Sequence, residues 1–319
     1  MLRRALLRMA QGAAVIVAAA TIAFLLLHLA PGDPATALGE GLSPELRATI
    51  RAQYGLDDSI ATQYWRWLQS LLRGDLGWSR AEHRSVAAVL ADALPRSLML
   101  MGCALTVSLV GGMLIGAWQG ARAGSRADRA TSMGLLIIYS IPEFWFAVML
   151  MAVFAHHLRW LPATGITSDM YEYLTPGEQR LDRLRHLILP LTSLSLIGVA
   201  VFARYQRLAM QESMTLPFVR TARAKGLSEP AVRREAWRAA LLPVISITGV
   251  MLPALLTGAV FVERVFSWPG MGYTMLRAIE ARDYPVVSAG VIFGSAATAL
   301  GAALADIARD FADPRVRSA

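Results

Sequence analysis

The sequence predicts an all-α integral membrane protein with six transmembrane helices. Its 319 residues are 55% hydrophobic and only 17% charged, whereas soluble proteins are about one-quarter charged. Apolar stretches recur at the length of about 20 residues that a helix needs to cross a bilayer. The segments between them alternate between basic and mixed or acidic, as the positive-inside rule describes. The net charge of +8 is therefore explained without a nucleic-acid partner.

Six apolar stretches define the predicted spans, and an even number places both termini in the cytoplasm. The first follows three arginines and is longer than a signal-peptide core, which favours an uncleaved span. A kink is expected in the third span at Pro142, and Pro243 and Pro253 interrupt the fifth. Small residues in the sixth, such as Gly290 and Gly294, predict close helix contacts. In chain order the spans are about 10–30, 97–118, 133–156, 187–202 or as far as 210, 240–262 and 286–307.

A long polar loop, residues 31–94, is expected to form an external subdomain between the first and second spans. It carries eight acidic and six basic residues. Ser43-Pro44-Glu45 is typical of a helix start. Tyr64, Trp65 and Trp67 suit either a helix at the membrane interface or the packing of the subdomain itself. The chain is thus divided into 1–94, the first span with this loop, and 95–319, the main transmembrane domain.

The stretch from Leu216 to Pro243 is the most basic loop and is predicted to form two short helices joined by a turn. Pro217 suits the first turn of a helix, and Gly226 suits the left-handed residue that ends one. Ser228 can cap the second helix. The spacing of Ala222, Gly226, Ser228 and Val232 also occurs in DNA-binding helix-turn-helix motifs. Because membrane-length apolar segments flank the stretch, docking of a cytoplasmic protein is preferred, and no nucleic acid is predicted.

Several kinds of chemistry are missing from the sequence. Cys103 is the single cysteine, so no disulfide within the chain is possible. The five histidines lack the spacing of a metal site, and Lys225 is the single lysine, so no phosphate-binding loop can be built elsewhere. No cofactor and no catalytic site are therefore predicted. The chain has the organisation of a transporter that needs an outside energy source.

Glu143 is the acidic residue that best fits a transport path. It follows Pro142 inside the third predicted span, and charge at membrane depth is costly unless it has a function or a partner. A structural ion pair with a neighbouring helix is the other interpretation. Glu263 and Asp306 lie near span ends and are interpreted as structural. The alternative function is an autonomous secondary transporter or channel that uses Glu143.

A series of short motifs resembles one family over nearly the whole chain. The family is the permease subunits of binding-protein-dependent ABC importers, in the oligopeptide, dipeptide and nickel group. Each motif is weak alone, but their order and spacing are specific. In order they are Gly32-Asp33-Pro34, Tyr54-Gly55-Leu56-Asp57, Gly74-Asp75-Leu76-Gly77, Ser140-Ile141-Pro142, Trp160-Leu161-Pro162, His186-Leu187-Ile188-Leu189-Pro190, Arg220-Thr221-Ala222-Arg223-Ala224-Lys225-Gly226, Phe266-Ser267-Trp268-Pro269-Gly270, Arg282-Asp283-Tyr284-Pro285 and Asp313-Pro314-Arg315.

The resemblance implies a type I importer permease in a bacterial inner membrane, and this chain resembles the larger-loop member of a permease pair. It implies coupling helices at about 215–240 that dock on separate ATPase subunits, with a second homologous permease, an external solute-binding protein and membrane lipid as further partners. Thr221 stands where the general coupling motif has an acid, as in this group. Peptide is the expected substrate, while nickel and glutathione-like compounds stay open. The implied coupling residues are Arg220, Thr221, Ala222, Arg223, Ala224, Lys225, Gly226 and Pro243.

Overall fold

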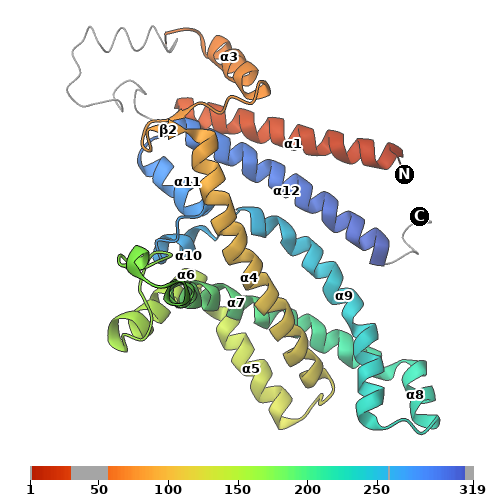
Figure 1. The fold of residues 1–319 in the computed structure, drawn as a ribbon. Coiled ribbons are helices and arrows are strands. Elements are labelled where there is room, and N and C mark those ends of the chain that lie inside the picture. The colour runs from red at the N-terminus through yellow and green to blue at the C-terminus, as the bar shows by residue number, and fades with distance from the viewer. Residues whose placement is uncertain (1, 30–56, 258, 313–319) are drawn as a thin grey trace.

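The chain folds almost entirely into helices, in a computed structural model that describes residues 2–29, 57–257 and 259–312 (Figure 1). The all-α class predicted from the sequence is confirmed. The short strands β1 and β2 pair antiparallel, with Trp78 opposite Ser85. In chain order the elements are α1 (Leu2–Leu29), α3 (Ile60–Leu72), β1 (Trp78–Ser79), β2 (Arg84–Ser85), α4 (Val86–Gly120), α5 (Arg126–Ser140), α6 (Glu143–Leu150), the π-helix η2 (Met151–His157), the 3-10 helix η3 (Tyr171–Tyr173), α7 (Pro176–Thr215), α8 (Pro217–Ala224), α9 (Glu229–Thr257), α10 (Val260–Val265), α11 (Met271–Glu280) and α12 (Tyr284–Ala312).

Three of the described helices are long and apolar enough to cross a membrane: α4, α7 and residues Tyr284–Ala303 of α12. A fourth crossing results if α5 and the segment α6–η2 count as one span, although the two halves are bent by 98°. The kink expected at Pro142 is thus confirmed, and it is a complete break in the helix. Within α1, residues Ala10–Leu26 form a shorter apolar helix. The count of six spans stays a prediction.

Two helices differ from what the predicted spans led us to expect. α7 begins at Pro176, not near residue 187, because Thr175 and Glu178 form a capping box there. The charged residues of its first turns have good helix propensity but are too polar for a membrane span. Hydropathy alone therefore does not indicate that the helix starts there. The fifth span was expected to be interrupted by Pro243 and Pro253, yet α9 is continuous from Glu229 to Thr257. The second helix of the basic stretch is therefore the start of a long helix.

The tightest packing in the described part of the fold joins α4 to α7, which cross each other over much of their length (Figure 1). Gly112, Gly116 and Gly120 of α4 face α7 at helical spacing. A Cβ atom built on Gly116 would lie 2.4 Å from the carbonyl oxygen of Ala203 and 2.7 Å from the Cβ of Gln206. Any larger residue would force the two helices apart, so these glycines set their separation.

The outer subdomain packs its aromatic residues against the first helix. Tyr64 and Trp67 of α3 lie 5.2 and 5.3 Å from the ring of Phe24 in α1, measured between ring centroids. The hydroxyl groups of Tyr64 and Thr21 are 2.8 Å apart. Trp65, in contrast, is 60% exposed. Packing therefore accounts for two of the three aromatic residues, and Trp65 is left facing outward. The helix start expected at Ser43 lies outside the described residues.

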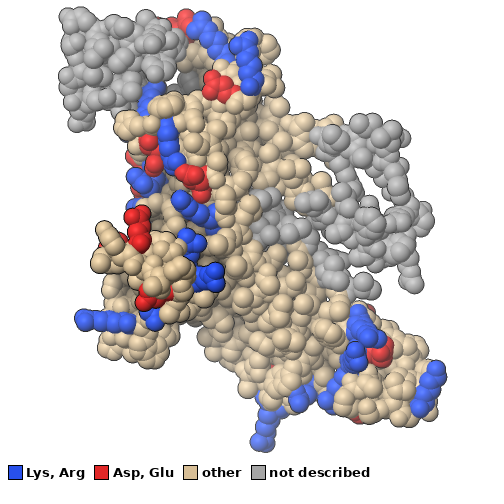
Figure 2. All heavy atoms as spheres, viewed as in Figure 1, with Lys and Arg blue, Asp and Glu red and all other residues tan. Residues whose placement is uncertain are grey.

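Charged side chains lie at the top, along the left side and at the lower end of the view, and a largely uncharged surface separates the lower group from the others (Figure 2). At the lower end, over α8 and the turn between α4 and α5, the charges are mostly basic. At the opposite end, near β2 and α11, acidic and basic side chains are mixed. This is the charge distribution that the positive-inside rule gives to a protein that spans a membrane.

Candidate functional site

The short helix α8 is built by local signals at both of its ends. Pro217 occupies its first position, where the missing N–H costs nothing. At its other end the Gly226 N–H donates to the Arg223 carbonyl at 2.9 Å, and the Leu227 N–H donates to the Ala222 carbonyl at 3.2 Å. These two bonds form a Schellman motif. Gly226 has a φ of +78°, so the left-handed conformation predicted from the sequence is confirmed.

The inner face of α8 is anchored between the ends of α7 and α9. Val219 is fully buried, and it belongs to a cluster with Met210 of α7 and with Val232 and Ala236 of α9. Ala222 is partly buried and packs against the same cluster. Because α8 is fixed to both long helices at once, it moves together with them.

The outer face of α8 carries apolar and basic groups side by side. Phe218 and Leu227 are each 40% exposed. Arg220 and Lys225 are exposed, and within the described chain neither has an acidic partner. Exposed apolar groups bordered by cations are typical of a surface that docks another protein. We call these four residues the outer face of α8.

Arg223 has a different role, because it closes the turn between α8 and α9. Its Nε donates to Oε1 of Glu229 at 2.8 Å, and its Nη2 donates to Oε2 at 3.3 Å. The Arg223 hydrogen bond holds the pKa of the Glu229 carboxyl below its ordinary value. The Ser228 carbonyl accepts from the Val232 N–H at 3.0 Å, as expected at the start of a helix. The pair thus bridges the turn between the two helices.

The structure brings together most of the predicted coupling residues but separates one of them. Residues 220–226 form α8 and its turn. Pro243 lies inside α9, 14 residues after its start at Glu229, or roughly 21 Å along the helix axis. Sequence reasoning did not single out Phe218 and Leu227. Their signal was available in the apolar residues that alternate with the arginines on this short helix.

Glu143 lies at the break in the third predicted span. It is the first residue of α6, directly after the Pro142 bend, and its side chain is exposed. Among the described residues no group forms a hydrogen bond or an ion pair with its carboxylate. The predicted alternative, an ion pair with a neighbouring helix, is therefore not formed within the described chain.

Glu263 is a buried carboxylate that holds the segment before α11 in place. The Ser97 hydroxyl donates to its Oε1 at 2.5 Å, and the Tyr273 N–H donates to its Oε2 at 2.9 Å. The Met271 N–H donates to the Ser97 hydroxyl at 2.7 Å. All of these groups come from α4, α10 and α11, so Glu263 ties three elements together, as the structural interpretation expects.

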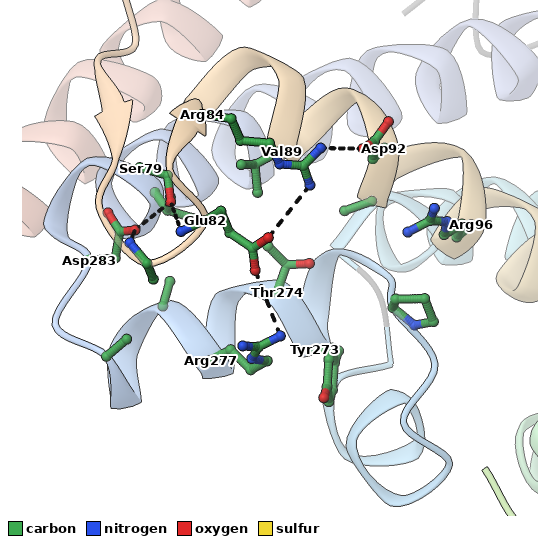
Figure 3. Close-up of a pocket in the computed structure, with 16 residues that line it drawn as sticks. Ser79, Glu82, Arg84, Val89, Asp92, Arg96, Tyr273, Thr274, Arg277 and Asp283 are labelled. Atoms are coloured by element: carbon green, nitrogen blue, oxygen red, sulfur yellow. Dashed lines mark hydrogen bonds and ion pairs between the residues drawn. The ribbon is translucent and has the colours of Figure 1, made fainter. Parts of the chain in front are cut away.

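A charged pocket of about 170 Å³ lies nearby, between the β1–β2 hairpin, α4 and α11 (Figure 3). Most of its charges are paired; Arg96, which also lines the pocket, has no ion pair among the described residues. Arg84 pairs with Asp92, and the carboxylate of Glu82 lies 3.8 Å from Arg84 and 3.7 Å from Arg277. This pocket therefore fastens the hairpin to α11. No group of three or more histidine, cysteine or acidic side chains that could hold a metal occurs among the described residues.

Comparison with known proteins identifies the same family along the chain. Residues 112–318 match the family described as binding-protein-dependent transport system inner membrane component, and residues 1–101 match its N-terminal membrane component family. A protein of Brucella ovis named as a peptide permease is 35% identical over 99% of both chains. The oligopeptide transport system permease protein AppB of Bacillus subtilis is 34% identical, covering 92% of this chain and 93% of the relative. The di/tripeptide transport system permease protein DppB of Pseudomonas aeruginosa is 36% identical, covering 93% of each.

Proposed function

Because this chain belongs to the family of inner-membrane components of binding-protein-dependent transport systems, we propose that it is one permease of an ATP-driven peptide importer. Its relatives are named as permeases for peptides, oligopeptides and di- or tripeptides. In this proposal an external binding protein delivers the peptide, and a second homologous permease completes the path. A separate ATPase hydrolyses ATP, so this chain contributes no catalytic site.

The observation that supports coupling is the two-sided construction of α8. Its inner face is locked to α7 and α9 through Val219, while its outer face exposes Phe218, Leu227, Arg220 and Lys225. A partner that moves this face moves two long helices with it. Unpaired cations at the rim favour an acidic partner surface and speed its association. The basic end then lies in the cytoplasm together with both termini, and the region 1–94 forms the external subdomain.

The test is Gly226→Asp. A Cβ atom at this position meets nothing within 4 Å among the described residues, so we expect no steric clash within the chain, and the added charge lies beside the proposed docking face. We expect the variant to insert into the membrane normally, but to lose copurification of the ATPase and peptide uptake. Normal uptake by Gly226→Asp would contradict the proposal.

A matched control exists on the outer side of the molecule. Gly74 has a φ of +79° and also has nothing within 4 Å of a built Cβ atom. Gly74→Asp therefore introduces the same charge with the same backbone strain, away from α8. We expect it to retain ATPase copurification and uptake. Equal losses in both variants would mean that strain, and not docking, causes the defect.

A further inference from the structure

The apolar face of α3 is wider than the part of it that packs on α1. At about 100° per residue, the apolar side chains fill one continuous arc of this helix. In order around the helix, the arc holds Trp67, Ile60, Leu71, Tyr64, Leu68, Ala61, Leu72 and Trp65. Tyr64 and Trp67 contact Phe24 of α1, whereas Trp65 and Leu72 are 60% and 80% exposed. α1 therefore leaves one edge of the arc uncovered, and we call Trp65 and Leu72 the free edge of α3.

The contacts with α1 place α3 at the depth of a membrane boundary. Thr21 and Phe24, the two α1 residues that meet Tyr64, lie inside the apolar stretch Ala10–Leu26. Thr21 stands eight residues before the end of α1 at Leu29, or about 12 Å along the helix axis. Over the same turns α1 exposes further apolar side chains, namely Ile22, Leu25, Leu26 and Leu29. The part of α1 that meets α3 thus presents apolar groups to its surroundings, as a helix in lipid does.

The side of α3 opposite the arc is polar and carries two arginines, Arg66 and Arg73. Seven positions make about two helical turns, so both arginines point the same way. Arg66 pairs with Asp58, whereas Arg73 is exposed and, within the described chain, has no acidic partner. A helix with tryptophan and leucine on one face and arginine on the other is typical of the membrane interface. There the apolar side chains enter the acyl boundary, and the cations face lipid phosphates.

The other end of α3 is tied to the same boundary through a short connection. Five residues separate α3 from β1, and the hairpin that β1 begins is held by Asp283 (Figure 3). Oδ2 of Asp283 accepts from the Ser79 hydroxyl at 2.6 Å and from the Ala81 N–H at 3.1 Å. Asp283 directly precedes Tyr284, where the apolar part of α12 begins. The hairpin therefore lies at the membrane end of α12, which holds α3 near that end from a second side.

We propose that α3 is an interfacial helix whose free edge enters the lipid of the outer leaflet. Trp65 and Leu72 lie among the upper acyl chains, and Arg66 and Arg73 face the phosphates. Tryptophan suits this position because its ring is apolar and its N–H is polar. Because α3 lies beside the end of α1 and not beyond it (Figure 1), this depth favours lipid over a soluble protein as the partner.

The helix then anchors the external region to the membrane. The choice of the outer leaflet rests on the topology in the proposed function, in which the basic end of the molecule is cytoplasmic. The contact with lipid itself requires neither a peptide nor an ATPase. Failure of the proposed function in an uptake assay and failure of this anchor are therefore separate results.

Spin labels on adjacent residues of α3 test the anchor. The full chain, with the subunits that copurify with it, is placed in lipid nanodiscs after Cys103→Ala removes its single cysteine. Labels are attached one at a time to Trp65→Cys, Arg66→Cys, Leu72→Cys and Arg73→Cys, and a sample without an introduced cysteine gives the background. Each neighbouring pair joins one residue of the free edge to one residue of the polar side, so the second member is the matched control.

Two relaxation agents separate lipid from water and from protein. Oxygen concentrates in lipid, whereas nickel ethylenediamine diacetate stays in water. We expect the nickel chelate to relax the labels at positions 65 and 72 about fivefold less than those at 66 and 73, because a polar chelate is excluded from lipid. Oxygen should relax the labels at 65 and 72 more strongly. Equal values within each pair would overturn the proposal by placing α3 in water.

Protection of positions 65 and 72 from both agents would also overturn it, because a protein then covers the free edge. If that protection arises only when the external binding protein is added, the free edge is the docking surface of that protein and not a lipid anchor.

A second measurement avoids labels. The emission lost in Trp65→Phe is that of Trp65, and phospholipids brominated near the head of the acyl chain should quench it roughly twofold if the ring lies at that depth. The control is Trp268→Phe, because Trp268 is 1% exposed and its Nε1 donates to the Arg96 carbonyl within the protein. We expect the emission of Trp268 to be unaffected by brominated lipid. Equal quenching of the two residues, or none of Trp65, would contradict the anchor.

Discussion

Val219 is expected to be the residue that makes α8 a rigid part of the transmembrane domain. A helix of eight residues is too short to be stable alone in water. Val219 is fully buried and is the buried residue of α8, so its contacts with α7 and α9 hold the helix. Val219→Ala removes two methyl groups at about 0.8 kcal/mol each and leaves a small cavity, for a loss of about 2 to 3 kcal/mol.

This loss should appear as local opening. Since 1.4 kcal/mol corresponds to a factor of ten, the opening equilibrium of α8 rises roughly 30- to 150-fold. Amide hydrogen exchange of the full chain in lipid nanodiscs reports it directly, because exchange from transient opening follows the local free energy. We expect faster exchange in α8 and its turn, with α4 unchanged. Coupling should loosen as well, so less peptide is transported for each ATP hydrolysed.

The matched control is the outer residue Phe218, which is 40% exposed on the same helix. Phe218→Ala removes a larger side chain, yet it should change exchange in α8 by less than threefold, because that side chain contributes little to the inner packing. It should instead weaken copurification of the ATPase. If Val219→Ala leaves exchange in α8 unchanged, or if it accelerates α4 equally, α8 is not anchored as described.

Three further outcomes follow from other contacts. Gly116→Leu should abolish stable insertion or lower the thermal midpoint of the purified chain strongly, because even a Cβ atom there would lie 2.4 Å from the Ala203 carbonyl; a wild-type midpoint would contradict the α4–α7 packing. Ser97→Ala removes the hydroxyl that donates to buried Glu263 and should lower the free energy of unfolding by about 1 to 3 kcal/mol. Its thermal midpoint should be lower than that of the control Thr106→Ala, where the hydroxyl donates only to a carbonyl of its own helix. Arg223 lowers the pKa of the Glu229 carboxyl. The pair therefore stabilises the turn above the ordinary carboxyl pKa of about 4.3, and this stabilisation is lost as the pH falls through the lowered pKa. Hydrogen exchange of the turn, corrected for the intrinsic exchange rate, should show more opening in acid for the wild type and no such change for Glu229→Gln.

The sequence was most informative where a local signal decides the structure. Pro217 and Gly226 each predicted their position in α8, because a missing N–H and a positive φ are properties of single residues. The break at Pro142 was likewise predicted. The start of α7 was missed, since hydropathy records membrane depth and the helix continues beyond the membrane.

The sequence was least informative where two distant segments meet. Small residues in the sixth predicted span indicated a tight bundle or a seam with a partner. A Cβ atom built on Gly290 would lie 1.8 Å from the sulfur of Met275, which confirms a close contact there, whereas Gly294 has nothing within 4 Å. The close contact of Gly116 in α4 with α7 was not predicted. The ion pair between Arg207 and buried Asp128 was also not predicted, because the two residues lie 79 positions apart in the sequence. The fold decides which small residues and which charged residues contact each other. A single sequence does not reveal those contacts.

The helix α7 is one continuous element that ends directly before α8. It has 40 residues and is therefore about 60 Å long. Its end is fixed to α8 through Met210 and Val219. If a partner displaces α8, as proposed above, we expect α7 to follow through this cluster and α4 to follow through its close contact with α7 at Gly116. In the proposed function, the docking face of α8, α7 and α4 would therefore move as one unit.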